Sequence, residues 1–82
     1  MDSGYRFENA GMVITCISFH SIGNRNVGLF QRESDGMYIT ARNTSKDKDG
    51  KYSWAWGNYF TGYTDALLDY YNRKAEMQRY TD

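Results

Sequence analysis

Apolar and polar residues alternate in several short segments of the first sixty residues, which is a pattern typical of β-strands. The first segment contains a nearly continuous apolar and β-branched run, as expected of a strand covered on both faces. Asp35-Gly36 is the preferred pair of a two-residue hairpin turn and would join the second and third segments. The pattern predicts strands over residues 11–19, 26–33, 37–42 and 51–56, the last ended or turned by Gly57-Asn58.

From about Thr61 the apolar spacing changes to that of an amphipathic helix. One stripe of this helix carries Tyr63, Leu67, Tyr70, Tyr71 and Lys74. The opposite side carries Asp65, Asp69, Asn72, Glu76 and Arg79, where both aspartates should stay solvated. We therefore expect a helix over residues 61–80 whose aromatic stripe covers the sheet.

These elements predict a single α+β domain over residues 1–82. Residues 1–9 form a loose lead-in, residues 11–60 the sheet and residues 61–80 the helix. The architecture is a four-stranded antiparallel meander with one C-terminal helix packed on one face, and the other face is expected to stay open.

Composition supports a folded domain and narrows the choice of partners. The chain has 82 residues, of which 40% are hydrophobic and 17% aromatic, enough for one small core. Ten basic residues balance ten acidic ones, so the net charge exerts no long-range attraction on phosphate. The same balance argues against an acidic protein that imitates DNA.

The single cysteine, Cys16, excludes a disulfide within the chain and suits a reducing compartment. No apolar run approaches the ~20 residues that cross a bilayer, and the first residues show no signal peptide. We therefore expect a cytoplasmic protein with no membrane partner.

Catalytic and metal chemistry find little support in the sequence. Cys16 and His20, each the only residue of its kind, fall on one face of a regular strand but about 13 Å apart, too far for a nucleophile and its base. One cysteine and one histidine do not make a zinc site. A calcium loop aligned on Gly50 would end at Trp56, where a glutamate is needed. We expect no enzyme, no metal and no cofactor.

Eight of the twenty residues from Tyr52 to Tyr71 are aromatic. Aromatic side chains dominate both cores and interfaces, so those on the last strand either pack against the helix or form an exposed binding surface. For the second case the candidate partner-binding residues are Tyr38, Arg42, Lys46, Lys48, Tyr52, Trp54, Trp56 and Tyr59. Three uses remain open: docking on another protein, stacking of single-stranded nucleic acid, and association of the chain with itself.

The segment GKYSWAWGNYF at residues 50–60, followed by ALLDYYNR at residues 66–73, resembles small accessory proteins of phages and mobile elements in Gram-positive bacteria. These proteins commonly show a strand, an aromatic corner and a final helix, and anti-CRISPR proteins are one functional group among them. The resemblance implies a non-enzymatic protein that binds and blocks a bacterial defence protein in the host cell, with a CRISPR effector as one candidate partner. The balanced charge departs from the acidic anti-CRISPR proteins, so contact through aromatic side chains is expected instead.

Overall fold

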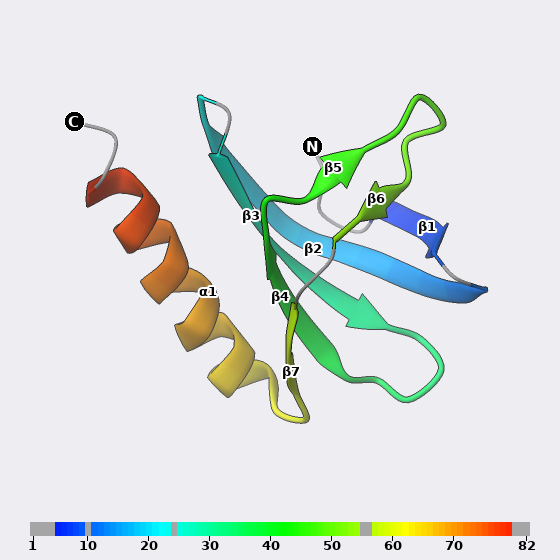
Figure 1. Ribbon diagram of the computed structural model, residues 1–82. Helices are drawn as coiled ribbons and strands as arrows, with labels where there is room; N and C mark the ends of the chain where they lie inside the picture. Colours follow the sequence, from blue (N-terminus) through cyan, green and yellow to red (C-terminus); the bar gives the residue numbers. More distant parts are fainter. Residues whose placement is uncertain (1–4, 10, 24, 55–56, 80–82) are drawn as a thin grey trace.

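The computed structural model describes residues 5–9, 11–23, 25–54 and 57–79, which form an antiparallel sheet and a C-terminal helix (Figure 1). The main sheet has five strands in the order β1-β2-β3-β4-β7, and β5 pairs with β6 in a separate hairpin. The elements are β1 (Tyr5–Asn9), β2 (Met12–Ile22), β3 (Arg25–Arg32), β4 (Tyr38–Arg42), β5 (Ser45–Lys46), β6 (Tyr52–Ser53), β7 (Gly57–Phe60) and α1 (Tyr63–Arg79). The predicted α+β class is confirmed, with five strands in the main sheet where four were predicted.

Strand β1 adds an edge strand to the sheet where the sequence predicted a loose lead-in. It pairs antiparallel with β2, with Tyr5 opposite Cys16 and Asn9 opposite Met12. Phe7 is its buried position, at 6% exposure. A large apolar side chain between two exposed charged ones, Arg6 and Glu8, is the alternation expected of a strand with one face on a core.

A β-bulge in β2 changes which face its side chains occupy. Cys16 lies opposite Phe30, but the next paired residue, Ser18, lies opposite Leu29, so Ile17 is the extra residue. An extra residue shifts the alternation by one. The expectation that Cys16 and His20 share a face is therefore wrong: Cys16 packs with Phe30, and His20 lies on the opposite face.

The turn between β3 and β4 is longer than the predicted two-residue hairpin. The amide of Arg32 donates to the carbonyl of Met37 at 2.9 Å, and that of Gly36 donates to the carbonyl of Arg32 at 2.8 Å, which leaves residues 33–36 in the loop. Gly36 has a φ of 73°, a conformation that glycine adopts without strain. The carboxylate of Asp35 bonds within the loop, where it accepts hydrogen bonds from Arg32 Nε at 3.0 Å and Nη2 at 2.6 Å.

The predicted last strand, residues 51–56, is replaced by two shorter ones. Strand β6 pairs with β5 outside the main sheet, whereas β7 pairs with β4 and begins at Gly57, which was predicted to end the strand. A Cβ at Gly57 would lie 3.1 Å from Ile39 Cγ2 and 3.2 Å from Trp54 Nε1. The glycine therefore serves close packing inside the sheet rather than a turn.

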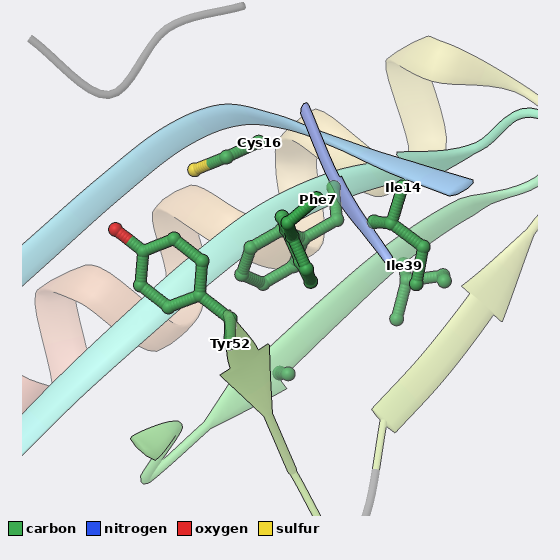
Figure 2. Packing of buried hydrophobic residues seen from close by; sticks show 7 residues of the cluster. Phe7, Ile14, Cys16, Ile39 and Tyr52 are labelled. Atoms are coloured by element: carbon green, nitrogen blue, oxygen red, sulfur yellow. The ribbon is translucent and has the colours of Figure 1, made fainter. Parts of the chain in front are cut away.

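Both faces of the main sheet are covered, so the expectation of one open face is wrong. The hairpin-side core, which the β5–β6 hairpin covers, consists of Phe7, Ile14, Cys16, Phe30, Ile39, Ala41 and Tyr52. The helix-side core consists of Val27, Leu29, Ala66, Tyr70 and Met77. Figure 2 shows Tyr52 reaching from β6 toward the sheet while α1 lies behind the sheet. The β5–β6 hairpin and α1 thus take the two outer layers.

Helix α1 packs on the sheet through part of the predicted stripe, Leu67 and Tyr70, together with residues outside that stripe. Its buried positions are Ala66, Tyr70 and Met77, whereas Tyr71, placed in the predicted stripe, is 53% exposed. The small side chain of Ala66 allows the helix to approach the sheet closely. Asp69, expected on the solvated side, faces β4, because its Oδ2 accepts a hydrogen bond from Thr40 Oγ1 at 2.5 Å.

Candidate functional site

The aromatic residues predicted to form one binding face belong mainly to the core. Tyr52 is 2% exposed and its ring lies 5.3 Å from that of Phe7 and 5.1 Å from that of Phe19. Trp54 is half-buried and stacked on Phe30, with ring centroids 4.7 Å apart. Trp56 lies outside the described residues. Tyr52 therefore has no surface to offer a partner, and the alternative that this face packs against the helix is also wrong, because it packs on the hairpin side.

The two predicted tyrosines of β4 and β7 lie on opposite faces of the sheet. Tyr38 is half-buried on the helix side, and its ring centroid is 5.2 Å from that of Tyr63. Tyr59 is 49% exposed on the edge strand, with the guanidinium of Arg32 5.4 Å from its ring centroid. Both are accessible in part, but they do not form one patch with the buried Tyr52.

The predicted lysines lie on the β5–β6 hairpin. Lys46 is exposed and its Nζ is 5.2 Å from the ring centroid of Tyr52, whereas Lys48 is exposed in the turn. Asp47 Oδ1 shapes this turn by accepting hydrogen bonds from the amides of Asp49 and Lys51, both at 2.9 Å. Among the described residues there is no group of three acidic, histidine or cysteine side chains that could hold a metal ion.

Arg42, one of the predicted residues, lines a pocket. This arginine pocket has a volume of about 280 Å³ and lies between the last turns of α1 and the ends of β3 and β4; it is lined by Arg25, Asn26, Arg42, Asn43, Arg73, Glu76 and Met77. Arg42 lies opposite Val27 on β3, which in turn lies opposite His20 on β2. The Nε2 atom of His20 is buried and has no hydrogen-bond partner among the described residues.

Asp69 accepts hydrogen bonds on the side of α1 that lies next to the arginine pocket. Its Oδ2 accepts from Arg73 Nε at 2.8 Å, in addition to Thr40. Desolvation alone would raise the pKa of Asp69, but the hydrogen bonds from Thr40 and Arg73 outweigh it and hold that pKa below its ordinary value. Arg73 is therefore ion-paired with Asp69. The hydrogen bond from Thr40 to the same carboxylate holds α1 on β4.

The side of α1 that points away from the sheet carries a second apolar stripe. We define the outer helix surface as Thr64, Leu68, Tyr71 and Ala75, which are all exposed. Leu68 is 59% and Tyr71 53% exposed. Spacings of four, three and four residues place all these side chains on one face of a helix, opposite the buried stripe.

Sequence reasoning missed the outer helix surface and two of the pocket's arginines, Arg25 and Arg73. The helical spacing of Leu68 and Tyr71 was readable in the sequence, but it competed with a neighbouring stripe that contained more aromatic residues. The pocket was not readable, because its residues come from three elements far apart in the sequence.

Within the described ranges, the chain contains no helix with the length and apolar character that crossing a bilayer requires. Comparisons with protein-family models, with curated proteins and with solved structures find no match for this chain.

Proposed function

We propose that this chain is a non-enzymatic protein that docks its outer helix surface into an apolar groove of a partner protein. The resemblance noted in the sequence suggests the partner class, a bacterial defence protein such as a CRISPR effector that the docked chain blocks by steric occlusion. The observation that carries the proposal is the pair of large apolar side chains, Leu68 and Tyr71, held exposed on a rigid helix.

The outer helix surface lies away from the sheet on which α1 packs. Helix α1 contacts β2, β3, β4 and β7, all of which lie on its sheet side (Figure 1). Burying a large apolar side chain is worth about 1.5–3 kcal/mol, so leaving both Leu68 and Tyr71 in water forgoes stability that a partner could recover. A helix with apolar residues at such spacing is a common element for recognition by a protein groove.

The flanks of this surface define what the partner groove has to accommodate. One flank carries Asp65, Asn72 and Glu76, all exposed, while Lys74 on the other flank lies with its Nζ 5.8 Å from the ring centroid of Tyr71. The stripe itself contains no charge. An apolar groove with polar rims matches this arrangement better than a polyanion, which would meet the acidic flank.

The two alternative uses of the chain have less support from the described residues. Stacking of single-stranded nucleic acid would need the face of Tyr52 and Trp54, which is occupied by packing on the hairpin-side core. Self-association through an open sheet face would need the same surface. The outer helix surface could still pair with a second copy, and the experiment below separates that outcome.

The experiment compares the wild type with Leu68→Glu and Tyr71→Glu in bacteria that carry an active defence system. The readout is the efficiency of plasmid transformation or phage plating, together with co-purification of the effector. We expect the wild type to relieve at least one CRISPR system, and each glutamate variant to lose at least about tenfold of that relief, because a buried charge at such a contact costs well over 1.4 kcal/mol.

Ser53→Glu is the matched control, because it adds the same charge at an exposed position of β6, away from the outer helix surface. It should keep full activity, and circular dichroism should show all variants folded. Full relief by a Leu68→Glu/Tyr71→Glu double variant would refute the proposed surface. A dimer in light scattering that this double variant abolishes would instead assign the surface to self-association.

A further inference from the structure

The arginine pocket carries more positive charge than the other described residues that line it neutralise. Arg73 is ion-paired with Asp69 at 2.8 Å, which leaves Arg25 and Arg42 against Glu76 in the pocket lining. Two positive charges against one negative leave one positive charge. Neither Arg25 nor Arg42 forms an ion pair with another described residue, so the excess is available to a ligand.

The side of the pocket that carries Arg42 is held by hydrogen bonds between Asn26 and the backbone of Asn43 and Thr44. Asn26 Nδ2 donates to the carbonyl of Thr44 at 2.9 Å and its Oδ1 accepts from the amide of Thr44 at 2.7 Å. The amide of Asn43 donates to the carbonyl of Asn26 at 3.1 Å, and Asn43 has a φ of 55°, a region uncommon for residues other than glycine. This clamp fixes the end of β4 against β3, so little ordering of the wall is needed when a ligand binds.

The size of the pocket limits the ligand to a small group. Its volume of about 280 Å³ lies just below the range for small-molecule sites, about 300–1,000 Å³. A single side chain fits such a space better than an extended chain does. Repeated phosphates along a nucleic acid would also need several cationic contacts, whereas this chain has no net charge.

We propose that the arginine pocket binds one carboxylate, the acidic side chain of a partner protein. Arginine presents its N–H groups in a planar fork that matches the two oxygens of a carboxylate. One such group would neutralise the single excess charge of Arg25 and Arg42. The inference rests on the proposed function for the source of the side chain, since it adds an acidic anchor to the apolar contact of α1.

The test is an NMR titration of the ¹⁵N-labelled chain with blocked glutamate, N-acetylglutamate α-amide, at constant ionic strength. Blocked glutamine is the matched neutral probe. We expect saturable shifts at the Nε–Hε groups of Arg25 and Arg42 with blocked glutamate and none with blocked glutamine. Arg25→Gln and Arg42→Gln should each weaken binding about tenfold, whereas Glu76→Gln should strengthen it severalfold by removing a like charge.

Arg6→Gln is the control for nonspecific charge, because Arg6 is an exposed arginine paired with Glu33 away from the pocket. It should leave the affinity unchanged. Shifts that rise linearly without saturation, or an equal loss in Arg6→Gln, would overturn the inference. Tighter binding of inorganic phosphate than of blocked glutamate by more than tenfold would overturn it in favour of a phosphate site.

The same titration on Leu68→Glu separates this inference from the proposed function. If Leu68→Glu loses partner docking but binds blocked glutamate normally, both proposals are supported. If the arginine variants lose glutamate binding but Leu68→Glu still docks on the partner, the proposal of the outer helix surface alone is refuted. Normal docking without any glutamate binding would refute the pocket alone.

Discussion

Substituting Gly28 with alanine tests how tightly the hairpin-side core packs on the sheet. A Cβ at Gly28 would lie 2.5 Å from both Cε2 and Cζ of Phe30 and 3.1 Å from Cδ2 of Phe19. Carbon atoms in contact are normally about 3.5–4.0 Å apart, so the ring of Phe30 would have to move by about 1 Å. We therefore expect Gly28→Ala to destabilise the fold even though it adds only one methyl group.

The neighbours of Phe30 determine how costly that movement is. Phe30 is fully buried, and its ring centroid is 5.9 Å from that of Phe7, 5.6 Å from that of Tyr52 and 4.7 Å from that of Trp54. A ring packed on three sides cannot turn away freely. Overpacking of this kind costs about 1–3 kcal/mol, and the lower backbone entropy of unfolded alanine returns about 0.4–1 kcal/mol. Because Phe30 is held on three sides, the overpacking cost should lie in the upper half of its range, which leaves a net loss of about 1–2.5 kcal/mol.

Thermal and urea unfolding measure this loss. For a domain of this size 1 kcal/mol corresponds to about 4–8 °C in Tm, so Gly28→Ala should melt about 5–15 °C below the wild type. Gly62→Ala is the matched control, because its Cβ would lie 3.6 Å from Asp65 Oδ2, an ordinary contact, and its Tm should stay within a few degrees. A Gly28→Ala protein that melts with the wild type and keeps its near-ultraviolet circular dichroism would refute the close packing of Phe30 on the sheet.

Three further predictions concern contacts that hold the outer layers. Tyr52→Ala should cost about 3–5 kcal/mol in urea unfolding, because it removes a buried ring from the hairpin-side core. Asn26→Ala should cost about 1–2 kcal/mol and enhance amide exchange at Thr44, since both bonds of the clamp are lost. Thr40→Val should raise the pKa of Asp69 toward its ordinary value. The lowered pKa of Asp69 stabilises the folded protein above about pH 5, and this stability is lost as the pH falls through the pKa of Asp69 in the folded state. The free energy of unfolding of Thr40→Val should therefore depend less on pH between about 5 and 2 than that of the wild type.

Local sequence signals predicted the elements that depend on local chemistry. The strand at residues 37–42 and the helix after Thr61 match β4 and α1 closely, because alternation and helical spacing extend over enough residues to be unambiguous. The turn after β3 was predicted at the right place but with the wrong length. The observed loop depends on the ion pair between Arg32 and Asp35. The turn preference of the Asp35-Gly36 pair, on which the prediction was based, does not include that contact.

The features that were missed depend on contacts between distant segments. The bulge at Ile17 has no local signature in an unbroken β-branched run, and it decides which side chains of β2 meet α1. Glycine is common in turns, so Gly57 indicates a strand end. In the structure, its lack of a side chain lets Ile39 and Trp54 pack close to the backbone of β7. Arg42 lines the arginine pocket because the register of β3 and β4 places it opposite Val27, two residues along β3 from Arg25. No pattern within one segment indicates that register.

The burial of Cys16 in the hairpin-side core makes the single thiol a reporter on the opening of that core. Cys16 is fully shielded from solvent, with β1 on one side of it and β3 on the other. A sulfhydryl reagent can reach it only after those strands separate. Labelling kinetics in the presence of an excess of reagent should therefore report how often this part of the native protein opens, without any engineered probe.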